Sequence, residues 1–188
     1  MNIDPNRAPE DEPGDVLRRR QRERTTRYRE HPADAWTTDQ AGTLADASDV
    51  SDPLHTSVDL GHDVRLELAV HERIGGFSEL PVPGDVLCAA LAACADSTLR
   101  IIASRLGVKL QRLAVRAEAD VDVRGTLCVE PAVPVGFQAM RVHVQLAAPD
   151  ADPRALSKLL LAAEQCCVVL RTLRSGVPVT VSWEHEQR

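Results

Sequence analysis

The chain has 188 residues, of which 44% are apolar and 3% aromatic, so the sequence predicts one domain with a core of Ala, Val and Leu. Its 22 basic and 28 acidic residues give a formal net charge of −6, which disfavours nucleic acid and anionic membranes as partners of the whole chain. No signal peptide is recognisable, and no apolar run approaches the roughly 20 residues that a membrane span needs. We therefore expect a cytoplasmic protein that binds neither nucleic acid nor membrane.

The five cysteines do not follow a pattern typical of secreted disulfide-rich proteins, because their number is odd. The sequence contains no Cys-x-x-Cys pair, and its cysteines and histidines are not grouped at the spacing of a zinc site. We therefore expect neither a structural metal nor a bound cofactor.

Residues 1–35 differ in composition from the rest and are predicted to be a charged N-terminal extension, rich in Pro, Asp, Glu and Arg, before a single domain over residues 36–188. Seven arginines fall between Arg18 and Arg29, where Glu23 is the one acid. Such a run is typical of a solvated helix or tail. The alternative interpretation is a binding arm for nucleic acid or an acidic partner.

Alternation of apolar and polar residues predicts a strand over 64–71 and two half-buried antiparallel strands over 113–123 and 140–146. A last alternating segment, 177–183, is expected to close the chain as a final strand. Together with the two helical segments between these strands, this order predicts an α+β protein.

Two long helices are predicted, and each has recognisable ends. The first is rich in Ala and runs from Asp85 to a glycine cap at Gly107; the second begins with Asp152 as its N-cap and ends near Arg174. Both are apolar on more than one face, which one small sheet cannot cover. We therefore expect antiparallel sheets around two long central helices in an intertwined homodimer.

Four cysteines lie in these helices: Cys88 and Cys94 in the first, Cys166 and Cys167 in the second. Thiols on two neighbouring helices can cycle between thiolate and disulfide, but a buried cysteine also serves as a small apolar core residue. Adjacent helical residues point about 100° apart, so periodicity does not choose between Cys166 and Cys167. Cys128 falls at a strand end or in a loop, where core packing or a passive surface role is expected.

Two segments form recognisable motifs: an Ala-rich stretch from Pro83 to Cys94, continued by residues 97–99, and a second cysteine-bearing stretch from Glu164 to Leu173. The first is similar to the Ala-rich cysteine helix of the OsmC/Ohr family of thiol peroxidases, and the second is similar to the second cysteine segment of that family. The resemblance covers roughly residues 53–185, including the segment 176–179 before the last strand. It implies an OsmC-like fold.

The resemblance also implies a chemistry and a choice between the thiols. Cys94 corresponds to the peroxidatic cysteine and Cys167 to the resolving one, so the chain is expected to reduce organic or lipid hydroperoxides in an oxidative stress response. The implied cycle takes Cys94 to a sulfenic acid, which condenses with Cys167 to a disulfide. An external dithiol, such as a lipoyl-bearing protein, then reduces that disulfide.

The resemblance identifies the residues that would activate Cys94 less specifically than it identifies the two cysteines. The family's glutamate falls on Gly84, so Asp85 beside it is the candidate carboxylate, although it also fits a helix cap. Arg65, Arg73 and His71 are the candidate cations from the segment before the helix. The alternative function is an OsmC-fold protein with little peroxidase activity that binds a small apolar ligand.

Overall fold

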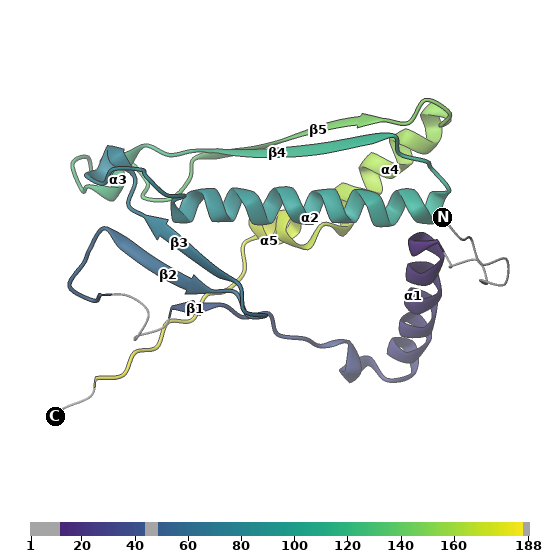
Figure 1. Cartoon of the computed structure of the whole chain (residues 1–188), viewed down its shortest axis with the longest axis horizontal. Coiled ribbons are helices and arrows are strands. Elements are labelled where there is room, and N and C mark those ends of the chain that lie inside the picture. Colours follow the sequence, from purple (N-terminus) through teal and green to yellow (C-terminus); the bar gives the residue numbers. More distant parts are fainter. Residues whose placement is uncertain (1–11, 44–48, 186–188) are drawn as a thin grey trace, which may run out of the picture.

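The structure is a computed structural model, and it describes residues 12–43 and 49–185, so the first eleven residues of the predicted extension lie outside the described residues. Its elements follow an α+β order along the chain (Figure 1). They are α1 (Pro13–Glu30), the 3₁₀ turn η1 (Pro32–Ala35), β1 (Gly42–Thr43), β2 (His55–Asp59), β3 (Arg65–Ala69), the 3₁₀ turn η2 (Glu72–Ile74), α2 (Pro83–Leu106), β4 (Arg112–Asp120), α3 (Val123–Thr126), β5 (Ala139–Ala147), α4 (Pro153–Cys166) and α5 (Val168–Ser175).

The strands form two separate antiparallel sheets, one with the order β1-β2-β3 and one that is the ribbon β4-β5. In the ribbon, Val115 pairs with Val144 and Leu113 with Leu146, so the apolar residues of both strands share the face toward α2. This confirms the predicted antiparallel strands. The small sheet lies on the side of α2 opposite the ribbon, and β3 ends near the N-terminal end of α2 (Figure 1).

Helix α2 is the centre of the fold, because the β4-β5 ribbon lies along one side of it and α4 and α5 cross another (Figure 1). Pro83 occupies its first turn, where the missing N–H costs nothing, and Gly107 ends it in the left-handed conformation, with φ 68°. The buried core sits where its C-terminal half meets α4. It consists of Leu99, Ile102, Ala103, Val108, Ala148, Leu159 and Ala163.

Among the described residues, α2 is the one helix that is long and apolar enough to cross a membrane, with a mean hydropathy of 1.7 over its most apolar stretch. The expectation that no apolar run reaches that length is therefore wrong. Ribbon and helices pack on α2, although only 22% of the stretch is buried in the single chain. Its exposed positions include Ala89, Ala90 and Ala93, which are too small to keep a neighbouring backbone at a distance.

The prediction of a second long helix through residue 174 is wrong, because the helix breaks at Cys167. There φ is −71° and ψ is 108°, which is extended backbone between α4 and α5. Cys167 closes α4 by donating its N–H to the Ala163 carbonyl, at 3.0 Å, and opens α5 by accepting from the Arg171 N–H, at 2.9 Å. The break leaves the first N–H groups of α5 without helical partners.

The predicted final strand over 177–183 is also wrong for the single chain. Residues 177–185 are irregular, and Val179, Val181 and Trp183 are all more than 80% exposed. A strand needs a neighbour that satisfies its backbone groups, and no described strand of this chain lies beside the segment. The alternating pattern of a strand is present in residues 177–183, but no described strand of this chain pairs with them.

Candidate functional site

Cys94 lies in the middle of α2, partly buried, at the point where the break between α4 and α5 faces it. The break brings the N-terminus of α5 to the thiol, so that the Val169 and Val168 N–H groups donate to the Cys94 sulfur. Thr98, one turn further along α2, also donates to this sulfur. Because a hydroxyl has a single proton, Thr98 shares this donation with the Cys94 carbonyl oxygen, which lies 2.7 Å from its Oγ1.

These donors lower the pKa of the Cys94 thiol. Burial by itself would raise the pKa of this thiol, but the hydrogen bonds from Val169, Cys167, Val168 and Thr98 favour the thiolate and leave the pKa below its ordinary value. The positive end of α5 acts in the same direction. The sulfur is therefore stabilised by backbone donors, a hydroxyl and the Cys167 thiol, and no side-chain cation from the described residues of this chain contributes.

Cys167 is the hydrogen-bond partner of Cys94 and has the opposite character. It is 1% exposed, and burial raises the pKa of its thiol, as does the neighbouring Cys94. The Leu170 N–H donates to its sulfur, which partly offsets this rise. The pair is therefore polarised: the opposite pKa shifts favour ionisation of Cys94 before Cys167, with the Cys167 thiol as the donor and the Cys94 sulfur as the acceptor.

The other three cysteines are not part of this pair. Cys166 is exposed and Cys128 lies in an exposed turn with φ 56°. Cys88 is partly buried nearer the start of α2, and burial, Asp85 and Glu118 all raise the pKa of its thiol. The structure thus brings together the two cysteines that the family resemblance selects, a choice that helical periodicity leaves open.

The four candidate supporting residues lie elsewhere in the single chain. Asp85 caps α2, where its carboxylate accepts the Val82 N–H at 3.0 Å. His71 accepts the Arg73 N–H through Nδ1, at 3.0 Å, and so caps the turn η2. The Arg73 side chain is exposed beside Glu72, and Arg65 is exposed at the start of β3. None of the four contacts Cys94 within the described residues of this chain.

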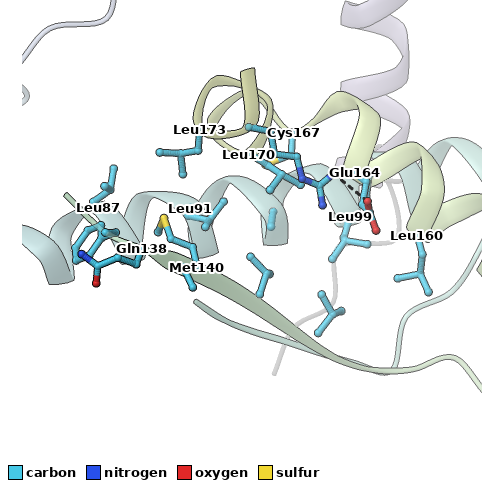
Figure 2. A pocket seen from close by; sticks show the side chains of 17 residues that line it. Leu87, Leu91, Leu99, Gln138, Met140, Leu160, Glu164, Cys167, Leu170 and Leu173 are labelled. Atoms are coloured by element: carbon cyan, nitrogen blue, oxygen red, sulfur yellow. Dashed lines mark hydrogen bonds and ion pairs between the residues drawn. The ribbon is translucent and has the colours of Figure 1, made fainter. Parts of the chain in front are cut away.

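Cys167 also forms part of the wall of an apolar pocket between α2, β5 and the α4–α5 segment (Figure 2). The pocket has a volume of about 710 Å³, within the range of small-molecule sites. Its walls are mainly Leu, Val and Met side chains. An ion pair of Arg174 with Glu164, at 3.1 Å, adds charge to one wall. The residues labelled in Figure 2 are Leu87, Leu91, Leu99, Gln138, Met140, Leu160, Glu164, Cys167, Leu170 and Leu173.

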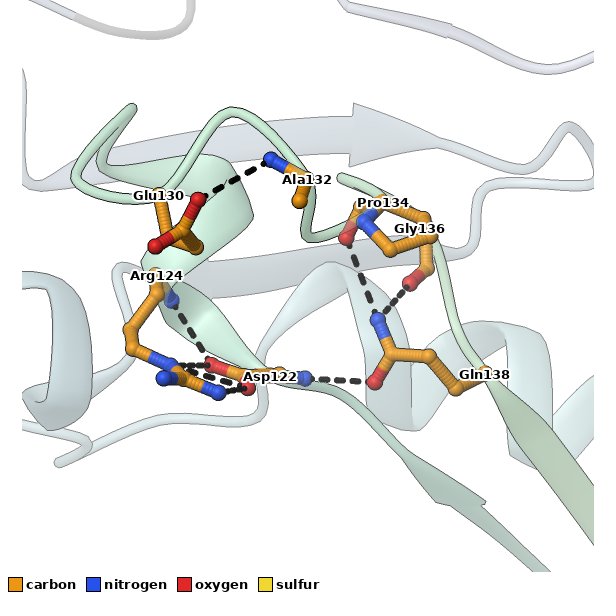
Figure 3. Close-up of polar contacts among 7 residues, drawn as sticks. All are labelled: Asp122, Arg124, Glu130, Ala132, Pro134, Gly136 and Gln138. Atoms are coloured by element: carbon orange, nitrogen blue, oxygen red, sulfur yellow. Dashed lines mark hydrogen bonds and ion pairs between the residues drawn. The ribbon is translucent and has the colours of Figure 1, made fainter.

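The long connection between β4 and β5 contributes residues to one end of this pocket, and polar contacts within the connection keep it in place (Figure 3). The Gln138 side chain donates to the Pro134 and Gly136 carbonyls, at 3.1 and 2.9 Å, and accepts the Asp122 N–H at 2.7 Å. Asp122 in turn pairs with Arg124. This network fixes Gln138 and the adjacent Phe137, both of which line the pocket.

Sequence reasoning missed the backbone donors at Val168 and Val169 and the ion pair of Glu164 with Arg174. No residue type marks the donors, because every residue except proline has an N–H; the signal would have been the helix break, which carries neither Pro nor Gly. The ion pair spans that same break. Among the described residues, no group of His, Cys, Asp and Glu is arranged to hold a metal ion.

Comparison with known proteins gives a family. A family model described as OsmC-like protein matches residues 76–182, more than half of the chain. No curated protein is similar enough in sequence to be matched.

Solved structures of low sequence identity share the fold. An OsmC-like protein from Mycoplasma pneumoniae is 14% identical, with a TM-score of 0.56 over 76% of this chain and 90% of that one. An organic hydroperoxide resistance protein OsmC from Legionella pneumophila is 18% identical, with a TM-score of 0.55 over 75% and 92%. An organic hydroperoxide resistance protein from Elizabethkingia anophelis is 18% identical, with a TM-score of 0.55 over 76% and 91%.

Proposed function

This chain belongs to the OsmC-like protein family, and we propose that it is a cysteine-based hydroperoxide reductase that works by a Cys94–Cys167 dithiol and disulfide cycle. The observation that carries the proposal is the polarised thiol pair at the N-terminus of α5. Two of the structurally similar proteins are organic hydroperoxide resistance proteins, which supports peroxide as the substrate.

The first step is attack of the Cys94 thiolate on one oxygen of the hydroperoxide. The S–O bond forms as the O–O bond breaks, so Cys94 becomes a sulfenic acid and the leaving alkoxide takes a proton to become an alcohol. The lowered pKa of Cys94 raises the fraction of reactive thiolate at neutral pH. The alkoxide takes this proton from solvent, into which the Cys94 thiol releases one on ionising, so the Cys167 thiol keeps its own proton for the second step.

The second step joins the two sulfurs. The Cys167 sulfur attacks the sulfenic sulfur of Cys94, a disulfide forms, and the hydroxyl leaves as water after taking the Cys167 proton. Both thiols are consumed and one hydroperoxide is reduced to alcohol and water. An external dithiol returns the enzyme to its starting state by exchange, and a lipoyl-bearing protein in a reducing cytoplasm is the reductant class we propose.

The pocket supports an organic substrate. Its walls are mainly apolar, and Cys167, the hydrogen-bond partner of Cys94, lines it. Burying an alkyl or aryl group there stabilises the complex by about 25 cal/mol per Å² of apolar surface, a gain that hydrogen peroxide cannot provide. We therefore propose organic or lipid hydroperoxides as the preferred substrates.

The proposal includes a homodimer that completes the site. Val168, whose N–H contacts the Cys94 sulfur, is 71% exposed, and the neighbouring Ala93 of α2 is exposed as well. The unpaired segment 177–183 presents further apolar side chains. A second copy that covers these surfaces would shield Cys94 from water and could bring Arg65, Arg73 or His71 of the partner subunit toward it.

The test is a titration of free thiols after addition of cumene hydroperoxide. The wild-type chain should lose two of its five thiols rapidly, Cys167→Ser should lose one, and Cys94→Ser should lose none on that time scale. Cys166→Ser is the matched control, because it removes the adjacent exposed thiol and should still lose two. Equal loss in Cys94→Ser and wild type would refute the proposal, and slow oxidation of every thiol alike would favour the apolar-ligand binding protein instead.

A further inference from the structure

Helix α1 has a charge opposite to that of the rest of the chain. It carries seven arginines against three acids, a local net charge of +4, whereas the whole chain has −6. None of its residues is buried. The expectation that the chain avoids polyanions rests on the total charge and does not describe this helix, which lies beyond the C-terminal end of α2 (Figure 1).

Three of the arginines share one face of α1. At 100° per residue, Arg18, Arg22 and Arg29 fall within about 40° of one another. Together with Arg105 of α2 they surround a hollow of about 460 Å³. The hollow contains no carboxylate, and it is lined by Arg18, Gln21, Arg22, Thr25, Thr26, Arg29 and Arg105.

Two of these arginines are held in place by hydrogen bonds to uncharged groups, and one of the two, Arg18, also by an ion pair. Arg18 donates through Nη1 to the carbonyl and hydroxyl oxygens of Ser104, at 2.7 and 2.6 Å, and its Nη2 pairs with Asp15. Arg105 donates through Nε to Gln21, at 2.9 Å. The bonds to Ser104 and Gln21 orient the two guanidinium groups without offsetting their charge, whereas Asp15 offsets part of the charge of Arg18; Arg105 is therefore the better placed of the two to bind an anion.

Arg22 and Arg29 have no acidic partner among the residues that the structure describes. The same holds for Arg20 and Arg24, which lie on the opposite face of α1, about 200° and 240° from Arg18. Within the part of the chain that the structure describes, α1 therefore presents guanidinium groups without an acidic partner in two opposite directions.

We propose that α1 binds the phosphate backbone of double-stranded nucleic acid. The row from Arg18 to Arg29 spans about 16 Å at 1.5 Å per residue. This length exceeds that of a single phosphate group, but a nucleic-acid strand carries a phosphate every few ångströms and can therefore contact several arginines of the row. Guanidinium groups bind phosphate oxygens in pairs, and the Thr25 and Thr26 hydroxyls add uncharged donors.

The two opposite faces favour a duplex over an acidic protein surface. A flat protein partner would contact one face of α1 and leave the arginines of the other face in solvent. A groove about 12 Å wide, such as the major groove of B-form DNA, admits an α-helix and places a phosphate strand on either side of it. The long arginine side chains can then reach both strands, without reading the base sequence.

The test is fluorescence anisotropy of a labelled 20-base-pair duplex of arbitrary sequence with the full chain, at salt concentrations from about 50 to about 200 mM. The wild type should bind, and its affinity should fall steeply with salt. Arg22→Gln/Arg29→Gln should weaken binding at least about tenfold and reduce the slope of log K against log salt by about 1.8, because each phosphate contact contributes about 0.9.

The matched control is Arg154→Gln/Lys158→Gln, which removes the same charge from exposed positions on α4 and should leave affinity and slope close to wild type. Circular dichroism checks that α1 persists. If Arg22→Gln/Arg29→Gln is poorly folded, Arg20→Gln/Arg24→Gln on the other face replaces it and should also reduce the slope.

Three results would overturn the proposal. One is no duplex binding by the wild type at the lowest salt concentration. Another is an equal effect of the α1 and α4 variants, which would reduce the interaction to total charge. The third is binding of pyrophosphate or of poly-glutamate, used as a model of an acidic partner, without binding of the duplex.

Discussion

The Cys94 and Cys167 thiols form a hydrogen bond across the break between α4 and α5, with Cys167 as donor and Cys94 as acceptor. The same break turns the first N–H groups of α5 toward Cys94. One departure from regular helix therefore positions the second thiol and stabilises the charge on the first, and both effects can be tested separately.

Val168→Pro tests the Val168 N–H donor separately from the break between α4 and α5. Proline fits the first position of a helix, so α5 should still form and stability should change by less than about 1 kcal/mol. The substitution removes the Val168 N–H, however, which should raise the pKa of Cys94 and slow its alkylation at neutral pH. The measurement is the pH dependence of iodoacetamide labelling at Cys94, resolved by mass spectrometry.

Val168→Ala is the control for that experiment, because it shortens the same side chain and keeps the N–H. Its Cys94 should titrate as in the wild type. Identical titration curves for the proline and alanine variants would mean that the backbone donor at residue 168 does not tune the thiol.

Asp85→Ala distinguishes a cap from an activating carboxylate. The Asp85 carboxylate accepts the Val82 N–H at the start of α2, so its loss should destabilise the protein by about 0.5–2 kcal/mol in chemical denaturation. Cys94 should keep its labelling profile, since it lies more than two helical turns away. A shifted Cys94 profile with unchanged stability would assign Asp85 to the reactive site.

Leu159→Ala tests where the stability of the fold resides. Leu159 is fully buried in the core between α4 and α2, so its truncation leaves a cavity and should cost about 2–5 kcal/mol of unfolding free energy. Leu161, on the same helix, is 63% exposed, and Leu161→Ala should cost less than about 1 kcal/mol. If Leu161 instead packs against a second copy of the chain, the losses of unfolding free energy in Leu159→Ala and Leu161→Ala would become similar at high protein concentration.

His55 links the small sheet to the loop before α2 in a pH-dependent way. The protonated ring donates through Nδ1 to the Asp52 carboxylate at 2.7 Å and through Nε2 to the Glu79 carboxylate at 2.6 Å, and these bonds raise the pKa of His55. The bond from His55 lowers the pKa of Asp52, and the Glu79 backbone together with His55 lowers the pKa of Glu79.

The sign of the pH effect follows from these directions. The His55 contribution to stability is complete below the ordinary pKa of about 6.5 and is lost as pH rises through the raised value. The carboxylate contributions are complete above about pH 4.5 and are lost as pH falls through the lowered values. The difference in unfolding midpoint between wild type and His55→Gln should therefore be largest between these limits and shrink on both sides; a difference independent of pH would contradict this.

Local sequence patterns determined most of the secondary structure. Alternation placed β3, β4 and β5, and Asp85 with Gly107 marked α2, which begins slightly earlier, at Pro83, because strand and helix periods and end-capping residues act through near neighbours in the chain. The same logic failed at Cys167 and over 177–183. A helix break without Pro or Gly, and a strand without a partner, depend on groups that are distant in sequence or on another molecule.

The sequence by itself also supplied two cysteine-bearing segments and a family resemblance, but helical period alone left Cys166 and Cys167 equivalent. The tertiary structure decided between them, because the break at Cys167 buries that thiol against Cys94 and leaves Cys166 exposed. It also brings the N–H groups of Val168 and Val169 to the Cys94 sulfur, where they favour the thiolate. Backbone donors leave no mark in a sequence, since every residue except proline has one; only the fold determines where they point.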